Sequence, residues 1–292
     1  MIVALKMIVT IRILVVLLAF PALGQSIAIR PPHTVIAGIS FSVTTEGSGS
    51  ATFYLLGPSH VVKKTIQLGQ DLPISGSDVA TSGLYQLVAC DSSGCSSADL
   101  YVLPSSPERL SFLVHPSRVP VSTANAINAT AVVSDRFRNT VVAPVTVMFH
   151  FSSADARPYS RSGPTSRGIA WLKIGSTTKQ GPLQIVAAVG ETSEARVIQQ
   201  VASEACGLRM QATSEARSVR LRTDPVRDCS GNALPDGTIV SFTKVDDAGR
   251  STVDTPLKKG VANAQFTLSG RARISVACGV VLGNEVSIAG QP

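Results

Sequence analysis

Beyond position 25, apolar residues recur in short extended runs rather than in long helical stretches. Between residues 219 and 223, valine and leucine alternate with two arginines, so one face of the segment is apolar and the other is charged. Similar runs rich in Val, Ile, Thr and Phe recur between clusters of Gly, Pro, Ser and Asn. The pattern predicts an all-β chain of sandwiches, in which alternate side chains of each strand enter a core.

Two joints divide this pattern. Residues 103–107 contain two prolines, and residues 199–204 form a polar stretch. A chain of 292 residues is too long for one ordinary sandwich and fits three modules of roughly 80 to 100 residues. We therefore predict domains over residues 25–105, 106–202 and 203–292.

The second and third predicted domains repeat one another. Segments 135–149 and 228–242 align without a gap, and four residue types coincide: Asp135 with Asp228, Asn139 with Asn232, Val147 with Val240, and Phe149 with Phe242. The Asp and Asn residues suit a chain reversal. The Val and Phe residues, two positions apart on a strand, point into one core, where burial contributes roughly 1.5 to 3 kcal/mol per side chain.

The third domain resembles a known family. Its turn and strand over residues 228–242, followed by the Gly-Val-Ala segment 260–262, resemble the bacterial immunoglobulin-like modules of invasin and intimin adhesins. The resemblance covers residues 205–290 well and residues 107–201 less well, because Arg138 there replaces the turn glycine. It implies immunoglobulin-like sandwiches that serve mostly as rigid spacers holding a binding tip away from the membrane.

The first domain resembles a different immunoglobulin-like sandwich. Asp78, Gly83 and Tyr85 match the immunoglobulin corner, in which the tyrosine hydroxyl binds the preceding loop. Leu87 stands where antibody domains carry a cysteine. The predicted fold is therefore three tandem immunoglobulin-like β-sandwich domains after an N-terminal signal peptide.

Residues 1–24 have the pattern of that signal peptide. Lys6 and Arg12 precede the apolar run 13–20, and small residues allow cleavage after Gly24. The alternative is an uncleaved anchor, but the run is far shorter than the roughly 20 residues of a membrane span. No second long apolar segment follows. We expect a secreted, periplasmic or cell-surface bacterial protein with no stable membrane span after cleavage.

All five cysteines follow the leader, where an oxidising compartment would let them pair. Cys90 and Cys95 flank four residues that suit a hairpin, so we expect them to form a disulfide. Half of a metal site is the alternative, but a second half is missing. In an immunoglobulin-like third domain, Cys229 and Cys278 lie near the same end, and this pairing is favoured. Cys206 starts the first strand near that end and could replace either.

The middle domain is the basic one. Lys and Arg minus Asp and Glu give −2 for residues 25–105, +5 for residues 106–202 and +2 for residues 203–292. The excess can attract anionic polysaccharide, lipopolysaccharide or lipid headgroups, or it can simply be a solubilising surface charge. We expect no nucleic-acid partner, because the basic residues are spread out and an exported protein rarely meets its own genome.

Trp171 is the single tryptophan of the chain. Alternation makes Leu172 and Ile174 the inward residues, so Trp171 faces outward and could form a surface binding patch with Met148 and His150. The alternatives are that Trp171 packs at a domain junction or that the strand is shifted by one residue.

The sequence contains no recognisable catalytic, metal or cofactor motif. The four histidines fall in separate segments without paired-ligand spacing: His33, His60, His115 and His150. We therefore expect a non-enzymatic structural or adhesive protein, with a protein or polysaccharide at the cell surface as partner. The alternative is a periplasmic or secreted accessory protein that binds carbohydrate or another polymer through its basic middle domain.

Overall fold

The computed structural model describes residues 26–154, 156–215 and 217–289, so the predicted signal peptide lies outside the described residues. Regular structure in these ranges is β-strand, apart from one short 3-10 helix, η2 (Gly76–Val79). The all-β prediction is confirmed. None of the described residues forms a helix long and apolar enough to cross a membrane.

The chain divides into two compact units, and the first ends at Ser105. This first module is a sandwich of a three-stranded and a five-stranded sheet. The three-stranded sheet has the order β1 (Ala28–Arg30), β3 (Phe41–Glu46), β6 (Leu72–Ile74). The five-stranded sheet has the order β2 (Thr34–Ile36), β8 (Gly94–Leu103), β7 (Gly83–Asp91), β4 (Ser50–Leu56), β5 (Val61–Gln67).

A buried tyrosine anchors the turn before β7. Tyr85 is fully buried, and its hydroxyl donates a hydrogen bond of 2.9 Å to the carbonyl oxygen of Thr81. This is the tyrosine corner that the sequence predicts. Leu87 is also fully buried, so an aliphatic side chain fills the core position that a disulfide occupies in antibody domains.

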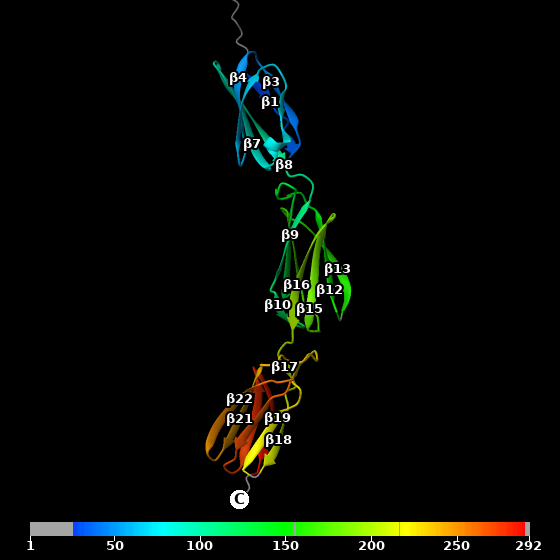
Figure 1. Cartoon of the computed structure of the whole chain (residues 1–292), viewed down its shortest axis with the longest axis vertical. Helices are drawn as coiled ribbons and strands as arrows, with labels where there is room; N and C mark the ends of the chain where they lie inside the picture. The colour runs from blue at the N-terminus through cyan, green and yellow to red at the C-terminus, as the bar shows by residue number, and fades with distance from the viewer. Residues whose placement is uncertain (1–25, 155, 216, 290–292) are drawn as a thin grey trace, which may run out of the picture. The chain divides into compact units, whose positions relative to one another are not determined.

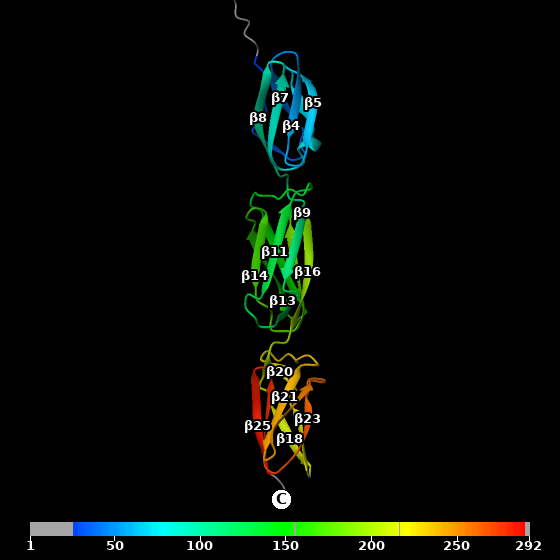
Figure 2. The ribbon, with the colours of Figure 1, turned by 90° about the vertical axis from the view of Figure 1, so that its left-hand side faces the viewer.

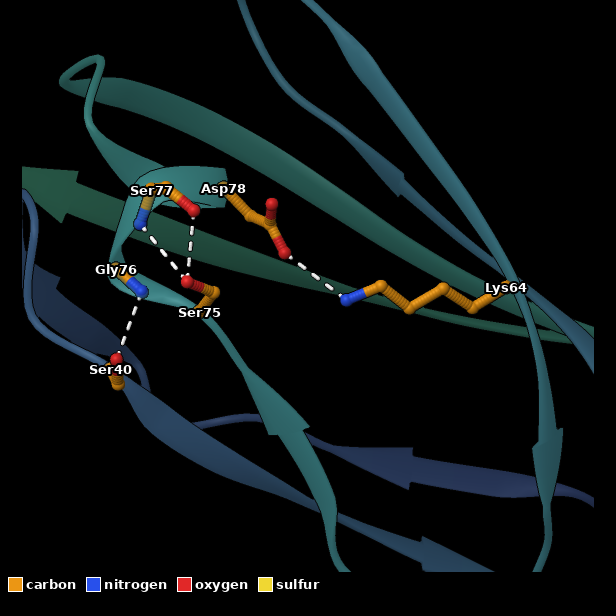
Figure 3. A network of polar contacts seen from close by, with 6 residues as sticks. All are labelled: Ser40, Lys64, Ser75, Gly76, Ser77 and Asp78. Carbon is orange, nitrogen blue, oxygen red and sulfur yellow. Dashed lines mark hydrogen bonds and ion pairs between the residues drawn. The ribbon is translucent and has the colours of Figure 1, made fainter.

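Polar contacts hold η2 between neighbouring segments (Figure 3). The N–H of Gly76 donates to Ser40 Oγ at 3.0 Å, and the Lys64 ammonium lies 3.2 Å from a carboxylate oxygen of Asp78. A partly exposed ion pair of this kind contributes only about 0 to 1 kcal/mol. These contacts therefore orient the turn more than they stabilise the module.

The second unit begins at Ser106 and contains two further sandwiches. In the middle module, one sheet has the order β10 (Arg118–Pro120), β16 (Thr192–Val201), β15 (Gly181–Val189), β12 (Thr146–Ser153), β13 (Ala156–Pro164). The opposite sheet has the order β14 (Ile169–Ile174), β11 (Ile127–Ser134), β9 (Arg109–His115). The strands of the five-stranded sheet are labelled in Figure 1. In Figure 2, β14, β11 and β9 of the opposite sheet lie side by side.

The third module repeats this two-layer plan. One sheet has the order β18 (Met210–Glu215), β19 (Ser218–Thr223), β23 (Asn263–Thr267). The other has the order β22 (Gly249–Pro256), β21 (Ile239–Asp246), β24 (Ala272–Cys278), β25 (Val281–Ile288). A two-stranded pair, β17 (Ala205–Cys206) with β20 (Arg227–Asp228), closes one end.

Each module of the second unit has its own hydrophobic core. Along the chain, Ile198 is the last buried residue of the middle core, and Ala205 is the first buried residue of the third core. Phe149 and Phe242, the aligned phenylalanines of the repeat, are both fully buried, one in each core. The strand alternation that predicted their inward orientation is confirmed.

We expect Phe242→Ala to destabilise the third module by about 3 to 5 kcal/mol, because the change leaves a cavity among fully buried side chains. Hydrogen exchange followed by mass spectrometry on the full chain should show lost protection in residues 205–289 only. Val245→Ala, on the exposed side of the same strand, serves as the control. Loss of protection in the middle module as well would show that the two cores unfold together.

Candidate functional site

Side chains suited to catalysis or metal binding are dispersed in this protein. Across residues 26–154, 156–215 and 217–289, no three His, Cys, Asp or Glu residues are grouped so that they could hold a metal ion. His150 is exposed on a strand and hydrogen-bonds to Ser160 Oγ at 2.7 Å. The features that remain for a functional site are an exposed sheet face, two disulfides and the loop 228–232.

The outer face of sheet β14-β11-β9 carries an apolar row. Trp171 on β14 and Leu113 on β9 are each 67% exposed, and both are register partners of Thr130 on the central strand β11. Neighbouring strands lie about 4.8 Å apart, so the three side chains form a continuous row across the sheet. Trp171 therefore faces solvent, as the alternation predicts.

Further residues extend this surface, which we call the Trp171 face. Ile169 and Val132 adjoin the row on one side, and Lys173, Asn128 and His115 adjoin it on the other. The outward-facing residues of the three strands include two cations and no carboxylate; they are Arg109, Ser111, Leu113, His115, Asn128, Thr130, Val132, Ser134, Ile169, Trp171 and Lys173. The face thus has an apolar centre and a polar rim, and the Glu194 carboxylate lies at its β9 edge, where Oε2 accepts from the N–H of Phe112 at 3.1 Å.

The predicted grouping of Trp171 with Met148 and His150 is wrong. Met148 and His150 lie on β12, in the five-stranded sheet, whereas Trp171 lies on β14, in the opposite sheet. Outward residues of two packed sheets point away from one another. The alternation of buried and exposed positions correctly predicted that Trp171, Met148 and His150 face outward. It could not predict which strands share a sheet. Leu113 was missed, although alternation with buried Leu110 and Phe112 marks it as outward.

Two disulfides cross-link the protein. Cys90 and Cys95 are register partners on β7 and β8 and form the expected bond across their hairpin. In the third module Cys229 pairs with Cys206, so the favoured pairing with Cys278 is wrong. Strand β17 pairs with β20 and brings Cys206 beside the loop, whereas Cys278 points into the hydrophobic core and is free.

The loop 228–232 is organised by the carboxylate of Asp228. Oδ1 accepts hydrogen bonds from the N–H groups of Ser230 at 2.9 Å and Asn232 at 2.8 Å, and Oδ2 accepts from Asn232 Nδ2 at 2.9 Å. Asp228 and Asn232 are both buried. The repeat in the middle module folds in the same way, because Asp135 accepts from the N–H and the amide of Asn139 at 2.8 and 2.9 Å.

The environment of Asp228 shifts its acidity. Burial by itself would raise the pKa of this carboxyl group. Hydrogen bonds from the Asn232 side chain and main chain, and from the N–H groups of Ser203 and Ser230, outweigh burial and lower the pKa below its ordinary value. The carboxylate is therefore charged at neutral pH and accepts hydrogen bonds from four donors: the N–H groups of Ser203, Ser230 and Asn232, and Asn232 Nδ2.

The fold is that of known tandem immunoglobulin-like proteins. No protein-family profile matches the sequence, and no curated protein sequence matches it. The chain is similar to the solved structure of invasin, a bacterial integrin-binding protein, with a TM-score of 0.52 and 11% identity over 92% of this chain and 60% of that one. It is also similar to InvD of Yersinia pseudotuberculosis, with a TM-score of 0.50 and 10% identity over 92% of this chain and 98% of that one.

At this level of identity the comparisons concern the fold. The resemblance to invasin-type modules, drawn above from residues 228–242, is confirmed in that sense. The chain spans 60% of the invasin structure, so the integrin binding named for that protein is not carried over. What the similarity establishes is a series of immunoglobulin-like sandwiches.

We expect Cys278 to be unreactive in the native protein. Its thiol is buried, and burial raises its pKa, so little thiolate is available to attack an alkylating reagent. Iodoacetamide without reductant should label nothing in the folded chain and Cys278 alone after unfolding in guanidinium. Peptide mapping that found the label on Cys206 would contradict the Cys206–Cys229 disulfide.

We expect the third module to lose stability in acid through Asp228. Since the pKa of this group is lower in the folded chain than in the unfolded chain, its charged form adds stability above the unfolded pKa, and that stability is lost as pH falls through the folded pKa. Asp228→Asn should weaken this acid dependence in urea titrations at a series of pH values. Asp254→Asn, on exposed strand β22, controls for the loss of one surface charge.

Proposed function

We propose that this protein is an exported, non-catalytic bacterial protein whose immunoglobulin-like domains, residues 25–105, 106–202 and 203–292, act outside the cytoplasm as adhesive or spacer modules. The observation that carries the proposal is the architecture of successive sandwiches. Disulfides in the first and third modules support export, because such bonds persist in oxidising compartments.

The Trp171 face is the adhesive surface in this proposal. Specific protein interfaces have an apolar centre with aromatic anchors and a polar rim, and tryptophan is enriched among the residues that dominate their binding energy. Trp171 and Leu113 supply such a centre, and Arg109, Lys173 and His115 supply such a rim. The partner is a cell-surface protein with an apolar patch bordered by carboxylates.

A second candidate is binding of an anionic polysaccharide. The absence of carboxylates among the outward residues of strands β9, β11 and β14 favours it, as does the net charge of +5 over residues 106–202. An exposed tryptophan can also pack against the apolar face of a sugar ring. Charge attraction would then supply most of the affinity, and the affinity would fall steeply with salt.

Trp171→Ala should reduce adhesion of the mature protein to cultured cells about thirtyfold, because loss of an anchor residue costs about 2 kcal/mol of binding free energy. Met148→Ala is the matched control, because Met148 is an exposed apolar residue on the opposite sheet. Adhesion would be measured by flow cytometry, on cells treated with protease or with glycosidases, and on immobilised alginate at 50 and 500 mM salt.

The outcomes separate the candidates. Adhesion that is sensitive to protease and to Trp171→Ala, with little effect of salt, supports a protein partner. Binding to alginate that disappears at high salt supports the polysaccharide instead. Equal adhesion by Trp171→Ala and Met148→Ala would contradict the role of the Trp171 face, and no adhesion in any arm would leave only the spacer role.

A further inference from the structure

The loop 228–232, predicted only to reverse the chain, also contacts the preceding module. The side-chain amide of Asn232 uses both ends in this contact. Nδ2 donates to the carbonyl oxygen of Thr178 at 2.9 Å, and Oδ1 accepts from the N–H of Gln180 at 3.1 Å. A hydroxyl contact of 2.7 Å joins Ser230 to Ser122 of the middle module. Asn232 is 5% exposed, so its two bonds are largely shielded from water, whereas the contact between Ser230 and Ser122 lies at the surface.

Both sides of the contact are held in place by buried polar side chains. On the middle module, Gln200 Oε1 accepts from the N–H of Thr177 at 2.6 Å, and its Nε2 lies 3.4 Å from the carbonyl oxygen of Lys179. On the third module, Asp228 fixes the Asn232 amide, as described above. Groups that are ordered before they meet lose less conformational entropy on contact. The two surfaces are therefore preorganised for each other.

The connecting chain is anchored at both ends of the joint. Val201 accepts a main-chain hydrogen bond of 2.8 Å from Val121 of the middle module, and the N–H of Ser203 donates to Asp228 Oδ2 at 3.1 Å. Ala202 alone lies between these anchored positions, and it packs against the third core. The Cys206–Cys229 disulfide then ties the start of the third module to the same loop. The chain that connects the two modules therefore has almost no unanchored residue at which it could bend.

We infer that the Asp228–Asn232 loop is a docking site for the end of a preceding sandwich and that it joins the middle and third modules into one rigid body. The loop binds main-chain groups of the preceding module, namely the carbonyl of Thr178 and the N–H of Gln180, two residues later. The two Asn232 bonds therefore do not depend on the partner's side chains, unlike the hydroxyl contact with Ser122. Any module whose end presents this pair of groups would fit the loop, which deepens the spacer role proposed above.

The first test is amide hydrogen exchange by NMR on the full mature chain. In Asn232→Ala, the N–H of Gln180 should exchange about tenfold faster, as expected for the loss of one hydrogen bond of about 1.4 kcal/mol. Asn284→Ala is the matched control. Asn284 makes the same two-ended contact, but with the main chain of Met210 inside the third module. It should leave Gln180 unchanged.

The second test measures the motion of the two modules directly. Spin labels at cysteines replacing exposed Ser162 and Ser251, one in each module, would give a distance distribution by pulsed electron resonance. The parent chain and Asn284→Ala should give a narrow distribution, and Asn232→Ala a broad one. If Asn232→Ala unfolds the third module, Gln180→Pro removes the donor from the middle module and should broaden the distribution in the same way.

Two results would overturn the inference. A broad distribution in the parent would show that the modules move freely, and unchanged exchange and width in both joint variants would show that Asn232 does not hold them. Neither result depends on adhesion. A failure of the joint is therefore distinguishable from a failure of the Trp171 face, which is measured by binding.

Discussion

A strand can place only alternate side chains in a core, and this constraint governs the whole protein. On β12, Phe149 and Phe151 are buried while His150 between them faces solvent. Because each strand buries one face, each module must close its own sandwich with a second sheet. The cores of the middle and third modules accordingly share no residue. What remains for contact with other molecules is the outer face of a sheet or the end of a sandwich.

The buried polar groups of the second unit follow from the same constraint. Its cores are apolar, and a buried polar group needs hydrogen-bond partners. Gln200, Asp228 and Asn232 are each buried, and each bonds to loop main chain near the joint instead of to core residues. These three side chains thus lie where the third module follows the middle one, whereas buried Lys244 bonds to Asp246 and to the carbonyl oxygen of Thr267 within the third module. Loops at the ends of rigid sandwiches commonly carry function.

The local sequence pattern was enough to predict the features that a single strand or a single turn determines. The inward Phe242, the outward Trp171 and the bonded hydroxyl of Tyr85 all follow from alternation or from a short motif. The Cys206–Cys229 bond and the separation of Met148 from Trp171 could not be predicted, because they depend on which strands share a sheet. Strand β17 has only two residues, so its pairing with β20 leaves almost no sequence signal.

The two copies of the Asp-to-Asn loop show which of its residues decides the conformation. Gly231 has a φ of +82°, and Arg138 at the equivalent position has a φ of +70°. A residue with a Cβ in this region costs roughly 1 to 2 kcal/mol. Each hydrogen bond to a charged acceptor contributes about 1.5 to 3 kcal/mol, and the Asp135 carboxylate accepts from the N–H of Phe137 and from the main chain and amide of Asn139.

The carboxylate therefore outweighs the strain at Arg138. The glycine makes the loop easier to form, but the aspartate determines its shape. The Asp and Asn pair, more than the intervening glycine, is the part of the motif that carries structural information. In the third module this same pair places the Asn232 amide against the preceding module.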